Sequence, residues 1–169
     1  MRGRSVLRPY IFVLAGLLTL ACNGSARTES PTAPGPGNVA FETILQRSIP
    51  SQSGGEIREV ARDDASWAAL WGRLRQGGGA GFLPAEPPAV DFSSDMVIAA
   101  AMETQSCVSK ITIRNITQGR GELVVDLLEA PPAPNCICIT SERPLHVVRL
   151  QRSADPIRFD VARGVTSCG

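Results

Sequence analysis

The spacing of apolar residues predicts one amphipathic helix in the first half of the chain. The apolar positions recur at intervals of three and four, which places them on one helical face, and they are Trp67, Leu70, Trp71 and Leu74. Asp63 or Asp64 provides the N-cap, and the glycines at 77–79 end the helix. A tryptophan pair can also form a ligand platform. At this spacing we expect it to cover a sheet, over Val97, Ile111 and Val125.

Apolar runs and alternations elsewhere predict about seven strands, at residues 40–45, 56–60, 96–102, 107–117, 122–128, 145–150 and 157–161. The run 96–102 is apolar throughout, as in a strand that is buried on both faces. Residues 118–121 provide a hairpin turn. A single helix among so many strands does not suit a parallel wound sheet. The pattern favours an α+β domain, a mainly antiparallel sheet with one helix packed on it.

An apolar run of a different kind lies near the N-terminus, at residues 10–21. Three arginines precede this run, and no acidic residue comes before Glu29. A basic start, a short apolar run and a small residue are typical of a secretory signal. A membrane-spanning helix needs about 20 apolar residues, so the run is too short for one. We therefore expect residues 1–21 to be a signal peptide.

The end of this run resembles a bacterial lipobox. It reads Leu-Thr-Leu-Ala-Cys over residues 18–22, although Thr19 and Leu20 depart from the commonest order. In such a motif the cysteine, here Cys22, receives the lipid; the alternative is a cysteine that happens to follow an ordinary cleavage site. Lipidation would anchor the mature protein to a bacterial membrane, in the cell envelope and outside the cytoplasm.

Residues 22–38 then form a tether that is rich in Pro, Gly, Ser and Thr, and residues 39–169 form the one foldable domain. The whole chain has 17 basic and 16 acidic residues. Three of the arginines belong to the signal peptide, so the mature protein is slightly acidic. This charge balance gives no support to nucleic-acid binding.

Few residues suggest catalysis, and we expect no enzyme. The single histidine, His146, lies in a predicted strand, and no Gly-x-Ser-x-Gly motif is present. A hydrolase would have to be assembled around His146, which is the alternative function. Asp91 and Phe92 precede the buried strand, and we expect Asp91 to make structural hydrogen bonds there, as part of the core with Phe92. No metal or other cofactor is expected.

Four cysteines remain besides Cys22, an even number that predicts disulfides in an exported protein. We expect Cys107–Cys136 and Cys138–Cys168, against the crossed pairing Cys107–Cys138 and Cys136–Cys168. The turn near residue 119 brings the start of the Cys107 strand opposite residues just after 130, which favours the first pairing. A metal site made of Cys136, Cys138 and His146 is the alternative, and an oxidising compartment weighs against it.

Six segments resemble, in order, the PrcB C-terminal domain family: residues 67–71, 90–92, 96–98, 111–113, 119–121 and 144–148. The resemblance covers residues 42–161 and rests on structural rather than catalytic motifs. Residues 105–108 depart from a glycine-containing start of a strand in that family. The family takes its name from a lipoprotein subunit of a bacterial surface protease complex. The anchor, the tether, the single small domain and the lack of a catalytic set favour a membrane-tethered binding or accessory module for another exported protein, and the resemblance adds an exported protease as a candidate for that partner.

Overall fold

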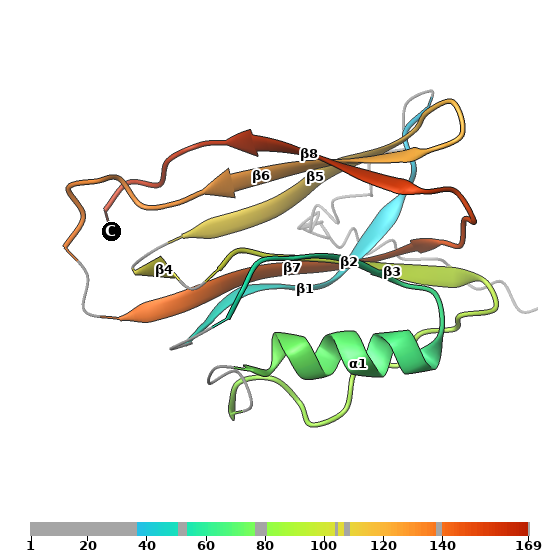
Figure 1. The fold of residues 1–169 in the computed structure, drawn as a ribbon, viewed down its shortest axis with the longest axis horizontal. Helices are drawn as coiled ribbons and strands as arrows, with labels where there is room; N and C mark the ends of the chain where they lie inside the picture. The colour runs from blue at the N-terminus through green and yellow to red at the C-terminus, as the bar shows by residue number, and fades with distance from the viewer. Residues whose placement is uncertain are drawn as a thin grey trace, which may run out of the picture. The chain divides into compact units, whose positions relative to one another are not determined.

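The computed structural model describes residues 37–50, 54–76, 81–103, 105–106, 109–137 and 140–168. This part contains one α-helix and eight strands, which confirms the predicted α+β class (Figure 1). Residues 1–36, on which the expected signal peptide, Cys22 and most of the expected tether fall, lie outside the described residues, as do Cys107 and Cys138. No helix in the described ranges is long and apolar enough to span a bilayer.

The strands are divided between two sheets rather than placed in one. The larger sheet has the order β1-β7-β3-β2, and a two-residue strand also pairs with β7. Its strands are β1 (Phe41–Pro50), β2 (Ile57–Ala61), β3 (Asp95–Ala101), β4 (Gln105–Ser106) and β7 (Ser141–Gln151). The smaller sheet has the order β5-β6-β8, with β5 (Lys110–Gln118), β6 (Leu123–Ala130) and β8 (Ile157–Arg163). Among the strand pairs described, β6 and β8 are parallel and the others are antiparallel.

The helix α1 (Asp64–Leu74) forms where the sequence predicts it. Asp63 is the N-cap: its carboxylate accepts a hydrogen bond from the Ser66 N–H at 2.7 Å. Trp67 and Trp71 are each 2% exposed and meet edge to face, with ring centroids 5.3 Å apart. Their indole N–H groups donate to carbonyls of the loop that follows the helix, at 2.9 and 3.0 Å. Burying both rings therefore leaves neither polar group without a partner.

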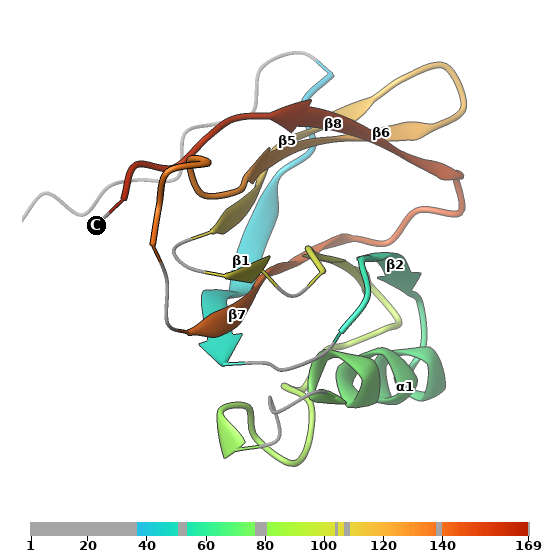
Figure 2. The same ribbon diagram turned by 60° about the vertical axis from the view of Figure 1, so that its left-hand side comes forward.

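The larger sheet is the middle layer of three, because its two faces contribute to two separate cores (Figure 2). One core lies toward α1 and holds the helical face together with Val97 and Phe92. The other contains residues of both sheets, including Ile111 and Val125. The sequence-based expectation is therefore correct for Val97 and wrong for Ile111 and Val125, because a second sheet needs its own apolar layer. β3 contributes to both cores, as its continuous apolar run predicts.

The two sheets are joined along the neighbouring strands β1 and β5. Just before β1, the Val39 N–H donates to the Ile116 carbonyl, and the Gln118 N–H donates to the Gly37 carbonyl, both at 2.7 Å. The chain then turns away from β5, and β1 pairs with β7 for the rest of its length. On the opposite side of the sheets, Arg58 of β2 forms an ion pair with Glu129 of β6.

Candidate functional site

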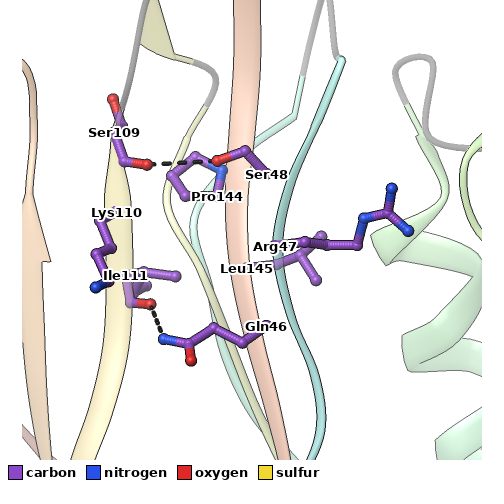
Figure 3. A pocket seen from close by; sticks show the side chains of 8 residues that line it. All are labelled: Gln46, Arg47, Ser48, Ser109, Lys110, Ile111, Pro144 and Leu145. Carbon is purple, nitrogen blue, oxygen red and sulfur yellow. Dashed lines mark hydrogen bonds between the residues drawn. The ribbon is translucent and has the colours of Figure 1, made fainter. Parts of the chain in front are cut away.

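A groove of about 270 Å³ lies where β1 and β5 separate (Figure 3). Eight residues from β1, β7 and the start of β5 line it: Gln46, Arg47, Ser48, Ser109, Lys110, Ile111, Pro144 and Leu145. Arg47 and Lys110 are the ionisable residues of this lining, which contains no histidine, cysteine or carboxylate side chain.

The polar side chains of the groove are used to hold the two strands together. The Gln46 amide donates to the Ile111 carbonyl at 3.2 Å and to the Thr112 hydroxyl at 3.0 Å. The Ser48 hydroxyl donates to the Ser109 carbonyl at 3.3 Å. In Figure 3 the guanidinium of Arg47 points away from the groove. The groove is therefore a seam between β1 and β5. The main-chain hydrogen bonds between the two strands have ended there, and side-chain hydrogen bonds connect the strands instead.

His146 lies in β7 beside this seam and is 2% exposed. The Ile113 N–H donates to His146 Nδ1 at 2.8 Å, so Nδ1 carries no proton. Nε2 then carries the proton and donates it to the Thr43 hydroxyl, with the two atoms 3.0 Å apart. The main-chain N–H of Ile113 points away from β6, and without this imidazole it would be buried with no partner at the edge of the sheet. The histidine thus joins strands of both sheets.

Burial lowers the pKa of His146 to about 4, because the interior disfavours the imidazolium. Both ring nitrogens are already engaged, one as acceptor and one as donor. A general base needs a free nitrogen within reach of the proton that it removes. Among the described residues, neither a serine nor a carboxylate forms a hydrogen bond with this ring. The arrangement therefore does not supply the base that the hydrolase alternative needs.

Asp91 makes the structural hydrogen bonds expected of it, in the turn that leads to β3. Its carboxylate accepts from the Ser93 hydroxyl at 2.6 Å and from the Ser93 N–H at 2.9 Å. Both hydrogen bonds lower the pKa of Asp91, and the one from the Ser93 hydroxyl has the larger effect. Its placement in the core is wrong, because the residue is exposed while its neighbour Phe92 is buried.

The cysteine pairing favoured by the sequence is also wrong. Cys136 is bonded to Cys168, with the Cα atoms 5.3 Å apart. The chain after β8 continues beside the chain after β6: the Thr166 N–H donates to the Pro131 carbonyl at 2.9 Å. This parallel continuation carries Cys168 to Cys136, and no local pattern predicts it. The observed bridge belongs to the crossed pairing, whose other members, Cys107 and Cys138, are not among the described residues.

The metal alternative loses two of its three ligands in this arrangement. The Cys136 sulfur is used in the disulfide, and both nitrogens of His146 are engaged. Within the part of the chain that the structure describes, no group of three or more His, Cys, Asp or Glu side chains is placed to hold a metal ion.

Arg143 is a buried residue to which no sequence pattern points. It lies in β7 and is 2% exposed. Its guanidinium donates to the carbonyls of Met102 at 3.3 Å, Arg73 at 3.1 Å and Gly55 at 2.5 Å. Burial lowers the pKa of Arg143. One side chain therefore fastens the end of α1, the chain before β2 and the end of β3 to β7, and nothing in the local sequence indicates this.

Comparison with known proteins adds no relative to this description. No family model matches the chain, and neither a curated protein nor a solved structure matches it.

Proposed function

We propose that this chain is an exported bacterial lipoprotein, anchored through lipid on Cys22, whose domain is a non-catalytic binding or accessory module for another exported protein. The resemblance to the PrcB C-terminal domain family makes an exported protease the expected partner. The membrane contact is the lipid itself, and no nucleic acid is involved.

The observation that carries the non-catalytic part of the proposal is the state of His146. It is the only histidine of the chain, and both its nitrogens are committed to main-chain and hydroxyl partners inside the fold. The groove beside it offers amide, hydroxyl and carbonyl groups that already bond to one another. These groups therefore stabilise the fold, as expected for the interior of a non-catalytic binding module.

The anchor and the tether support the rest of the proposal. Residues 18–22 carry the features of a lipidation site, and residues 23–36 are rich in Pro, Gly, Ser and Thr. A flexible or extended segment of this composition lets a domain reach a partner at some distance from the membrane. The domain is attached to the tether at Gly37, whose carbonyl is bonded to Gln118 of β5.

Membrane fractionation of the native host tests the anchor. Wild-type chain should remain with the membranes, and Cys22→Ser should be released or fail to mature. Ser25→Ala, in the tether, is the matched control and should behave like the wild type. Equal membrane retention of Cys22→Ser and the wild type would contradict the proposal.

Affinity purification of the anchored protein, followed by mass spectrometry, tests the partner. An exported protease, or another exported protein, should be enriched in a fixed ratio to the chain, and Trp71→Ala should lose it because the domain unfolds. Hydrolytic activity that resides in the purified chain alone would contradict the assignment as an accessory module.

A further inference from the structure

The edge strands of the two sheets differ in whether their outer main-chain groups already have hydrogen-bond partners. The outer edge of β5 is closed along its length: Ser48, Gln46 and His146 bond to it through their side chains, and residues 37–39 bond to it through the main chain. β2 has only five residues. β8 has seven and lies at the outer edge of the smaller sheet (Figure 1). Nothing in the described ranges pairs with its outer side.

The hydrogen bonds of β8 to β6 show which of its groups are free. The Leu123 N–H donates to the Pro156 carbonyl at 2.9 Å, and the Gly164 N–H donates to the Glu129 carbonyl at 2.7 Å. Even-numbered residues of the strand therefore face β6. Because alternate residues of a strand direct their main-chain groups to opposite sides, residues 157, 159, 161 and 163 present N–H and carbonyl groups outward. Such a row of groups is a template for a further strand.

The side chains of β8 are self-complementary about Phe159. In an antiparallel pair of two β8 strands with Phe159 at the two-fold axis, each Arg158 lies opposite the other copy's Asp160. Ile157 lies opposite Val161, and Asp155 opposite Arg163. In this register the odd-numbered residues, which present their main-chain groups outward, lie opposite odd-numbered residues and can form the hydrogen-bonded pairs, while Arg158 and Asp160 occupy the non-hydrogen-bonded pairs between them. Opposite charges across a strand pair stabilise it.

Neighbouring registers lack this complementarity. Centring the pair on residue 158 places Arg158 against Arg158, and centring it on residue 160 places Asp160 against Asp160. Like charges directly opposite each other destabilise a strand pair. In the single chain Arg158 already pairs with Asp160 and Glu122 on the same face. In the dimer, Arg158 and Asp160 of both copies would form one four-residue cluster.

We infer that two copies of this chain associate through their β8 strands, antiparallel about a two-fold axis at Phe159, to form one continuous six-stranded sheet. The occupant of the β8 edge is thus a second copy of the chain, since the charge order of the strand fits itself. Val161 is 45% exposed and becomes covered beside Ile157 of the other copy. The inference does not depend on the lipid anchor or on the identity of an exported partner.

A single pair of seven-residue strands is a small contact beside the roughly 1,200–2,000 Å² of total surface that stable interfaces bury. The dimer should therefore dissociate on dilution. Sedimentation of the mature full chain in density-matched detergent, over a wide range of concentration, should show a reversible monomer–dimer equilibrium. A monomer throughout that range would overturn the inference.

Charge exchange tests the register. Arg158→Asp alone and Asp160→Arg alone should each weaken dimerisation by about tenfold or more, because like charges then face each other. An equal mixture of the two variants should restore association as a heterodimer, because every pair across the axis is again of opposite sign. Arg114→Glu, on β5 of the same sheet, is the matched control and should dimerise like the wild type.

Two results would overturn the β8 interface. One is dimerisation of either single variant at wild-type strength, and the other is a mixture that stays monomeric while both variants remain folded by circular dichroism. Loss of the dimer together with unchanged membrane retention and partner capture would separate this inference from the proposed function.

Discussion

Ile113 of β5 donates its main-chain N–H to the imidazole of His146 of β7, over 2.8 Å, and so joins the two sheets through one side chain. The imidazole accepts this bond only when Nδ1 is unprotonated. The contact between the sheets therefore depends on the neutral form of the ring.

This dependence predicts a loss of stability in acid. Because the pKa of His146 falls from an unfolded value of 6.5 to about 4 in the folded protein, the unfolded chain binds the proton first as the pH falls. The free energy of unfolding should therefore decrease from pH 6.5 down to about 4, by about 3 kcal/mol from this residue. Urea unfolding at a series of pH values measures it.

His146→Gln is the matched variant for that series, because its amide can accept from Ile113 and donate to Thr43 without titrating. The chain has one histidine, so the difference between wild type and variant isolates its contribution. The variant should lose less stability than the wild type between pH 6.5 and 4. Parallel curves for the two proteins would contradict the assignment.

Gly54 approaches Arg143 so closely that a side chain should not fit there. A Cβ at Gly54 would lie 2.9 Å from Arg143 Nε, and three hydrogen bonds to main-chain carbonyls hold that guanidinium in place. Gly54→Ala should lower the free energy of unfolding by about 1–3 kcal/mol. Gly55→Ala is the neighbouring control, since nothing lies within 4 Å of its added Cβ. Equal unfolding midpoints for the two variants would show that Arg143 moves freely.

Trp71 should be essential to the core between α1 and the larger sheet. It is 2% exposed, and its N–H is bonded to the Pro84 carbonyl. Trp71→Ala should cost about 3–5 kcal/mol, a large part of the stability of a domain of this size. Phe82, which is 48% exposed, provides the control: Phe82→Ala should change the melting temperature little. A Trp71→Ala protein that melts with the wild type would refute this packing.

The disulfide of the C-terminus should appear as a Cys136–Cys168 peptide in non-reducing mapping. The bridge spans 32 residues and should contribute about 2–4 kcal/mol. Cys136→Ser and Cys168→Ser should each lose this amount, and the double variant should lose no more than either. An additive loss in the double variant would contradict the bridge. The crossed pairing further predicts Cys107–Cys138 in the same map.

The sequence predicted the parts of the fold that depend on local pattern. The helical face around Trp67, the cap at Asp63 and the doubly buried β3 follow from periods of three to four residues or from an unbroken apolar run. The buried position of Trp71 could be predicted for the same reason.

The remaining features depend on contacts between distant segments, which local patterns do not reveal. β8 belongs to the second sheet because it pairs in parallel with β6. The paired residues lie 34 positions apart in the sequence. The same pairing places Cys168 beside Cys136. The partners of His146 likewise come from β1 and β5, so its role as a link between sheets is visible only in the folded chain.

The intact mass of the mature protein from its native membranes tests the central claim most directly. We expect a chain that begins at Cys22 and carries the added mass of a diacylglycerol group, with or without a further acyl chain. An unmodified N-terminus, or a mature chain that begins at any other residue, would contradict the assignment as a lipid-anchored lipoprotein.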